Sequence, residues 1–212
     1  IGEIFGLDET RTLIDNLKRE HPALVQEVFD RALLSVPELT EVLRRLVRER
    51  VTIRDLKLIL EGVTEFSALA PDKEDRSSWL MELHGFLRRV LSRSIVSDAV
   101  GSSRKLRGFI LAPDLEEEFR AAVSGWDGGR TRPVLEPDLE LALRTSAGKM
   151  FLPVLERGAL PVVVLCAGDI RRAVHEFFSE QLSSAEWLRT LAFEELDSRY
   201  RPDGSGGYGT SH

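Results

Sequence analysis

The spacing of apolar residues changes once along the chain, and this change limits the folds open to it. Up to about residue 100, apolar residues recur every three or four positions, which is typical of amphipathic helices. Beyond Gly101, short apolar runs bounded by Gly, Pro and polar residues alternate with helical patterns, which predicts strands followed by helices. We therefore expect an α+β protein: an all-helical part, then a small α/β part with a sheet of three or four strands.

The helical part contains recognisable helix starts. Asp8 is a candidate N-cap for the first helix, and Ser35 and Glu38 have the spacing of a capping box. Thr52 is a candidate cap for the following helix, and a further helix spans the apolar residues from Leu80 to Leu91. The helix after Ser35 is expected to bury Leu39, Val42, Leu43, Leu46 and Val47.

The second part is expected to alternate strands and helices. Pro153 should break or kink the helix that runs from Pro137 towards Arg157. The other predicted helices cover residues 114–124 and 169–182. Strands are expected at residues 106–111, 134–135, 161–166 and 187–193. The Gly/Ser-rich end, residues 201–212, is expected to be disordered.

Composition excludes several classes of protein. With 29 Lys and Arg against 35 Asp and Glu, the chain has a net charge of −6, which argues against a dedicated nucleic-acid binder. Its single cysteine allows no internal disulfide, and its four histidines lack the spacing of a helical zinc site. The apolar run from Leu160 to Ala167 is too short to span a membrane. The chain begins without an initiator Met, so we expect it to be part of a longer protein.

One catalytic arrangement needs consideration. Cys166 ends a predicted strand just before a helix, and His175 follows nine residues later, so a Cys–His nucleophile is conceivable. That spacing places the two side chains about 9–14 Å apart along the helix, and a buried, inert cysteine is the commoner case. The loop from Gly125 to Arg130 lacks the ending of a phosphate-binding loop. We expect no enzyme activity and no catalytic, cofactor-binding or metal-binding residues.

A basic segment from Arg44 to Lys57 carries six basic and two acidic residues. Two helices joined near Arg50 could form a helix-turn-helix, so a DNA-binding regulator with an α/β effector domain is the alternative function. The rest of the chain is acidic, which favours a protein partner with acidic residues.

Two stretches carry a family resemblance. His-Pro-Ala-Leu-Val-Gln-Glu-Val at 21–28, and residues 39–61 with Ile53-Arg54-Asp55-Leu56 at their core, resemble the large export-gate protein of bacterial type III secretion systems and flagella. Leu135-Glu136-Pro137, Ile170-Arg171 after an apolar run, and Leu191–Leu196 resemble later motifs of the same family, with Phe193 in place of a tyrosine.

The resemblance implies an organisation. Residues 1–20 would be the last helix of a preceding subdomain, 21–100 an all-helical subdomain and 104–200 an α/β subdomain. The full protein would be held in the bacterial inner membrane through a region N-terminal to this segment, which would lie in the cytoplasm.

The resemblance also implies partners. Cytoplasmic domains of the family form a nonameric homo-oligomeric ring that takes part in docking and selecting secretion substrates and chaperones for export. Expected partners are further copies of the chain, chaperones, substrates and other export-apparatus proteins, with no nucleic acid and no cofactor. The candidate subunit-interface residues are Arg44, Arg45, Arg48, Arg50 and Arg54.

Overall fold

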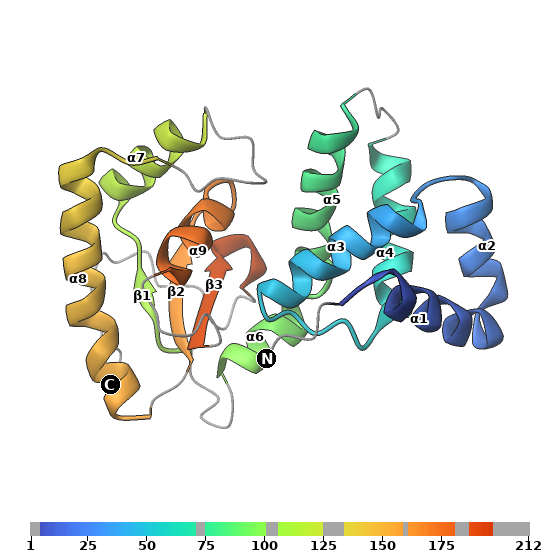
Figure 1. Ribbon diagram of the computed structural model, residues 1–212, viewed down its shortest axis with the longest axis horizontal. Helices are drawn as coiled ribbons and strands as arrows, with labels where there is room; N and C mark the ends of the chain where they lie inside the picture. Colours follow the sequence, from blue (N-terminus) through green and yellow to red (C-terminus); the bar gives the residue numbers. More distant parts are fainter. Residues whose placement is uncertain are drawn as a thin grey trace. The chain divides into compact units, whose positions relative to one another are not determined.

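The computed structural model divides into two compact units with a boundary between Ile95 and Val96 (Figure 1). It describes residues 5–70, 75–100, 106–124, 134–158, 161–180 and 187–196. The change of hydrophobic period therefore corresponds to a change of architecture.

The first unit is helical, as predicted. Its helices are α1 (Leu7–Glu20), α2 (Pro22–Asp30), α3 (Val36–Arg48), α4 (Leu56–Leu69) and α5 (Arg76–Val90). Helix α6 (Ser92–Val100) begins in this unit and continues into the second. Helix α3 packs on α1 and α5, and α4 packs on α5 and α2, so the core lies between these helices.

The predicted capping box at the start of α3 is confirmed. The backbone N–H of Ser35 donates to Glu38 Oε2 at 2.7 Å, and the N–H of Glu38 donates to Ser35 Oγ at 3.4 Å. The cap predicted at Asp8 is wrong, because α1 begins at Leu7 and Gly6 is its N-cap. The backbone N–H of Gly6 donates a hydrogen bond to Glu9 Oε2 at 2.8 Å.

The cap predicted for α4 is also wrong. Asp55 is the N-cap, and its Oδ1 accepts a hydrogen bond from the N–H of Leu58 at 3.0 Å. Thr52 Oγ1 instead accepts from the N–H of Arg54 two residues later, a local turn that precedes the helix. Both residues can cap, and the one nearest the apolar stripe of α4 does so.

The apolar stripe of α3 is buried, with one exception. Leu39, Val42, Leu43 and Leu46 are all almost fully inaccessible, whereas Val47 is 37% exposed. Position 47 lies at the edge of the stripe, so the prediction that Val47 is buried is wrong.

The second unit is built on a three-stranded parallel sheet in the order β1-β2-β3. The strands are β1 (Phe109–Ile110), β2 (Val162–Cys166) and β3 (Leu188–Ala192), and Val164 is aligned with Phe109 on one side and Thr190 on the other. Strand β2 lies in the centre and is buried along its whole length. Three of the predicted strands are confirmed, although β1 is shorter than expected.

The predicted edge strand at residues 134–135 is wrong. Val134 is 80% exposed and the chain there is irregular, because α8 begins immediately afterwards at Pro137. The tail at 201–212 lies outside the described residues.

Helices α8 (Pro137–Glu156) and α9 (Arg171–Ser179) pack on the sheet, and α7 (Pro113–Val123) packs on α9. A 3-10 turn, η3 (Phe193–Glu195), follows β3. Pro153 does not end α8, which continues to Glu156. The proline lies in the last turn, where a missing N–H removes at most one intrahelical hydrogen bond.

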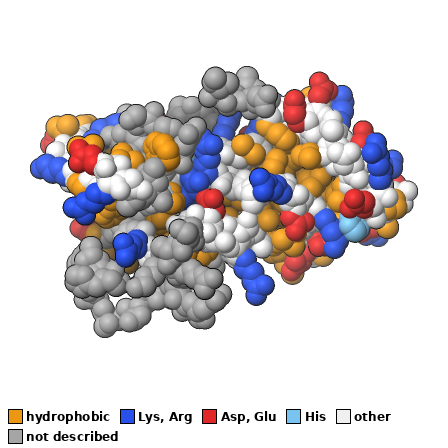
Figure 2. Space-filling model, turned by 90° about the horizontal axis from the view of Figure 1, so that it is seen from below, with side chains coloured by type: hydrophobic (Ala, Val, Ile, Leu, Met, Phe, Trp, Pro, Cys, Tyr) orange, Lys and Arg blue, Asp and Glu red, His pale blue; other side chains and the backbone are white. Residues whose placement is uncertain are grey.

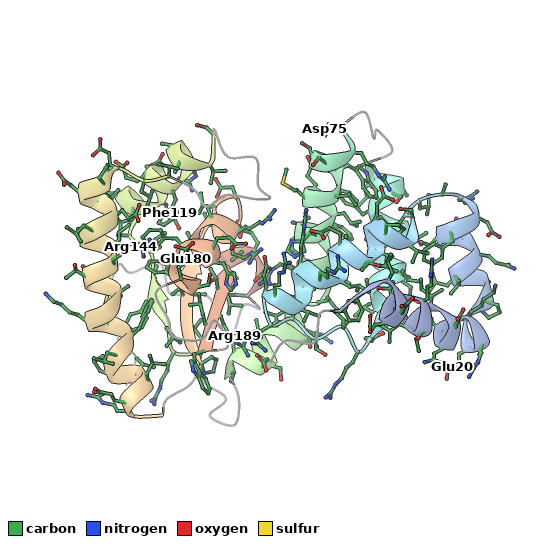
Figure 3. The ribbon with its side chains drawn as sticks, in the orientation of Figure 1. Glu20, Asp75, Phe119, Arg144, Glu180 and Arg189 are labelled. Atoms are coloured by element: carbon green, nitrogen blue, oxygen red, sulfur yellow. The ribbon has the colours of Figure 1, made fainter. Side chains whose placement is uncertain are left out.

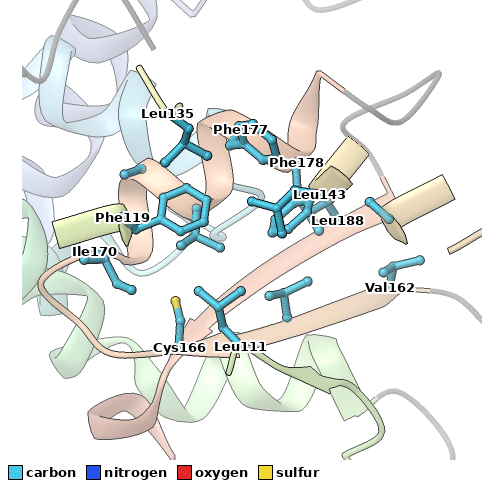
Figure 4. Close-up of a cluster of buried hydrophobic side chains, with 14 of the residues drawn as sticks. Leu111, Phe119, Leu135, Leu143, Val162, Cys166, Ile170, Phe177, Phe178 and Leu188 are labelled. Atoms are coloured by element: carbon cyan, nitrogen blue, oxygen red, sulfur yellow. The ribbon is translucent and has the colours of Figure 1, made fainter. Parts of the chain in front are cut away.

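Aromatic rings fill the core between these helices and the sheet (Figure 4). Phe119 from α7 meets Phe177 from α9 edge-on at 5.7 Å, and Phe151 from α8 meets Phe178 at 5.5 Å. At the surface, Arg144 on α8 points towards Glu180 at the end of α9, with a 3.4 Å contact (Figure 3). The helices are thus fixed to one another by both apolar and polar contacts.

Candidate interaction surface

The Cys166 thiol is a core group. It is fully buried at the end of β2, and this burial raises its pKa to about 12, so the thiol remains protonated at neutral pH. His175 is held by a different partner, since its Nδ1 lies 3.2 Å from Thr190 Oγ1. A protonated thiol is not a nucleophile, and the structural interpretation of Cys166 is therefore the better one.

The carboxyl edge of the sheet, where open parallel sheets bind ligands, is covered by the protein's own side chains. Glu116 on α7 accepts the N–H of Ala167, just after β2, at 2.8 Å. Arg120 on the same helix donates to Asp169 at 2.6 Å. The backbone N–H of Ala167, which follows the central strand, is thus bonded internally. Within the described ranges, no group of three or more His, Cys, Asp or Glu side chains could hold a metal ion.

Arg44 and Arg45, two of the predicted interface residues, have side-chain hydrogen bonds within their own unit. Arg44 Nε donates to the backbone oxygen of Phe5 at 2.6 Å, which joins α3 to the residues before α1. Arg45 Nε donates to Glu41 one turn earlier on α3 at 2.9 Å. Both side chains are partly covered.

The other three arginines are exposed. Arg48 ends α3, and Arg50 follows in a left-handed conformation with φ 60°. Arg54 lies beside an open groove of about 450 Å³ between α1 and the segment before α4, with Phe5, Leu13 and Ile53 as its apolar lining and Asp8, Glu9 and Thr12 as its polar lining. The structure therefore brings Arg48, Arg50 and Arg54 to the surface along the α3–α4 connection.

That connection differs from a helix-turn-helix. Helix α3 ends at Arg48 and α4 begins at Leu56, so seven residues separate them. The DNA-binding motif joins its two helices by a turn of about three or four residues. The geometry does not favour the DNA-binding alternative.

A buried ionic cluster was missed by sequence reasoning. Glu49 Oε2 lies 2.9 Å from Arg88 Nη1 and 3.5 Å from His84 Nε2, and all three side chains are buried. Glu49 was counted only as one acidic residue of the basic segment. The available signal was weak: His84 and Arg88 stand four residues apart on the same helical face as Leu87 and Leu91.

Surface charge on the helical unit is mixed. In the view of Figure 2, apolar side chains gather near the middle of the right half, and Lys and Arg as well as Asp and Glu lie around them. No helix in the described part of the chain has both the length and the apolar character needed to cross a membrane.

The chain is similar in sequence and in fold to several known proteins. The chain is 29% identical over 203 residues to Protein MxiA of Shigella flexneri, covering 94% of this chain and 27% of MxiA. Its fold is similar to that of nonameric EPEC SctV-C, with TM-score 0.73 and 26% identity over 92% of this chain and 55% of the other. It is also similar to one chain in the structure of the Chlamydia pneumoniae CdsV and CdsO protein complex, with TM-score 0.70 and 25% identity, covering 94% of this chain and 54% of the matched chain.

The chain spans about a quarter of the length of the curated relatives it matches. The FHIPEP family matches residues 1–201, which is nearly the whole sequence. Together with the helical unit and the three-stranded unit that follows it, this match identifies the chain as a member of the FHIPEP family.

Proposed function

We propose that this chain is the ring-forming cytoplasmic part of a type III secretion export gate, a non-enzymatic protein that takes part in docking and selecting substrates and chaperones. The match to the FHIPEP family over residues 1–201 carries the proposal. Similarity to an assembly described as nonameric supports a ring of nine copies. Similarity to the CdsV and CdsO complex supports partnership with other secretion proteins.

The proposed location follows from the same reasoning. The full protein would be anchored in the inner membrane by a region N-terminal to this segment, with this segment in the cytoplasm. Within it, residues 1–20 would close a preceding subdomain, 21–100 would form the helical subdomain and 104–200 the α/β subdomain.

The ring contact is proposed to use the basic segment. Of the five candidate residues, Arg48, Arg50 and Arg54 are the exposed ones. The side chains of Arg44 and Arg45 are bonded within the helical unit, so we expect them to support the ring contact less directly. A ring closed by rotation needs two different surfaces on each copy, so these arginines would meet an acidic surface of the next copy.

Secretion by cells that carry the full-length protein tests this function. Reversing Arg48 and Arg54 together to Glu should strongly reduce export of substrates while leaving the amount of protein unchanged. Arg157→Glu is the control, because Arg157 is also exposed but lies at the end of α8. Normal secretion by the double variant would remove these residues from the interface, and secretion by a strain lacking the protein would refute the export function.

A further inference from the structure

In the described part of the chain, three helices end in a turn that places one residue in the left-handed region of backbone conformation. The residues are Ala32 after α2, Arg50 after α3 and Gly158 after α8, with φ of 51°, 60° and 64°. Glycine is the usual residue in such a turn, because every other side chain is crowded by the backbone there. Arg50 is therefore a long charged residue at a position where the backbone favours glycine.

The turn after α3 has both hydrogen bonds of a Schellman motif. The N–H of Val51 donates to the backbone oxygen of Leu46 at 2.8 Å, and the N–H of Arg50 donates to that of Val47 at 3.0 Å. Val51 and Leu46 are both buried, as is usual for the two apolar residues of this motif. The turn at Ala32 has the same two backbone bonds, so the two turns can be compared directly.

Buried neighbours hold the turn at Arg50 on both sides. Glu49, which directly precedes it, is 8% exposed, and its Oε2 lies 2.9 Å from Arg88 Nη1 on α5. Val51, which directly follows it, is 4% exposed. Arg50 itself is exposed. The backbone of Arg50 is thus fixed by the residues around it, and such fixing allows a strained conformation to persist.

The end of α3 does not need a cation at position 50. Positive side chains near the C-terminus of a helix are favourable, but Arg45 and Arg48 already supply them in the last turn of α3. A glycine at this position would close the helix with less strain. Strain that is kept at a residue whose side chain reaches solvent points to a use of that side chain in recognition.

We propose that Arg50 is the central contact of the basic segment and that it binds a carboxylate on a second copy of this chain. The basic segment holds six of the 29 basic and two of the 35 acidic residues, so the rest of each copy is acidic and offers such a partner. A backbone that is already fixed has less freedom to lose on binding, which favours the contact. This inference rests on the proposed function and adds to it which arginine the fold holds ready.

Thermal unfolding of the chain, followed by circular dichroism, measures the strain. Arg50→Gly and Ala32→Gly should each raise the unfolding temperature of the helical unit by about 2–8 °C, because glycine adopts the left-handed conformation freely. Arg50→Asn should not lower it, since asparagine tolerates the same conformation. A lowered unfolding temperature for Arg50→Gly would overturn the inference, because Arg50 would then stabilise its own helix end.

Assembly of the full-length protein, measured over a range of concentrations, tests the contact. Arg50→Gly and Arg50→Asn should each raise the concentration needed for half-maximal assembly by about 10-fold or more, the loss expected for a central arginine of an interface. Ala32→Gly is the matched control: it relieves the same strain and should assemble like the unmodified protein.

The outcomes separate this inference from the proposed function. Assembly of Arg50→Gly at the unmodified concentration would overturn the inference and leave the ring in place. Normal assembly of Arg50→Asn beside a defective Arg50→Gly would also overturn it, because the defect would then come from a freer backbone. An unmodified protein that does not assemble would refute the ring, and this inference with it.

Discussion

Glu38 joins the start of α3 to α5, and its removal gives a measurable loss of stability. Its carboxylate accepts two hydrogen bonds from Arg76, at 2.6 Å from Nε and 3.0 Å from Nη2, as well as the N–H of Ser35 at 2.7 Å. These donors, chiefly the Arg76 guanidinium, lower the pKa of Glu38 from 4.5 to about 2. We predict that Glu38→Gln destabilises the helical unit at pH 7.

The size of the stability loss follows from the pKa shift of Glu38 and from the exposed fraction of its ion pair with Arg76. A shift of this size corresponds to at most about 3 kcal/mol at 1.36 kcal/mol per pKa unit. The side chains of Arg76 and Glu38 are 30% and 24% exposed, so solvent screening reduces the value. We expect Glu38→Gln to lower the free energy of unfolding by about 1–2 kcal/mol.

The stability difference between the unmodified chain and Glu38→Gln should depend on pH. A carboxylate whose pKa is lowered on folding contributes stability above its unfolded pKa and loses that stability as pH falls towards the folded value. The difference between the unmodified chain and Glu38→Gln should thus be full at pH 7, shrink below about pH 4.5 and vanish near pH 2. Urea unfolding followed by tryptophan fluorescence measures it, since Trp79 lies under the Arg76 guanidinium at 4.3 Å.

The control for this experiment is an exposed ion pair. Glu61 lies 3.3 Å from Lys57 on α4, and both side chains are 47% exposed, so Glu61→Gln should cost no more than about 0.5 kcal/mol. Equal stability of Glu38→Gln and the unmodified chain at pH 7, or a difference that persists unchanged at pH 3, would refute the reasoning.

Two further predictions concern packing and reactivity. A Cβ added at Gly62 would lie 2.7 Å from Leu87 Cδ2, so Gly62→Ala should destabilise by about 1–3 kcal/mol in urea unfolding. Gly85→Ala meets no atom within 4 Å and should be neutral or stabilising by up to about 1 kcal/mol; a similar loss at both positions would contradict this account. The Cys166 thiol, whose pKa burial raises to about 12, should resist alkylation at pH 8 until urea unfolds the chain, and rapid labelling of the native protein would show that the thiol is accessible.

Sequence patterns predicted the architecture because periodicity depends on local geometry. Each apolar pattern can be buried in only one kind of element. The stripe of Leu39, Leu43 and Leu46 is buried on a helix, and the run from Val162 to Cys166 is buried in a strand, so the helical unit and the central strand were predicted correctly. Boundaries were less certain where two residues could perform the same task. Thr52 and Asp55 can both cap a helix, and only the position of the apolar stripe decides between them.

Long-range polar contacts could not be predicted from the sequence. The contact of Arg44 with Phe5 and that of Glu49 with Arg88 each join residues 39 positions apart. No spacing rule connects such pairs, because their meeting depends on how whole helices pack. The basic segment was therefore recognised as a group, while the division between internal and exposed arginines became clear only in the structure.

Assembly of the full-length protein is the central claim, and counting its copies tests that claim most directly. Native mass spectrometry should find assemblies of nine copies, the number in the similar EPEC SctV-C assembly, which Arg48→Glu with Arg54→Glu disrupts and Arg157→Glu preserves. A full-length protein that remains monomeric at high concentration would contradict the ring, and a double variant that still forms nine-copy assemblies would contradict the basic segment as its interface.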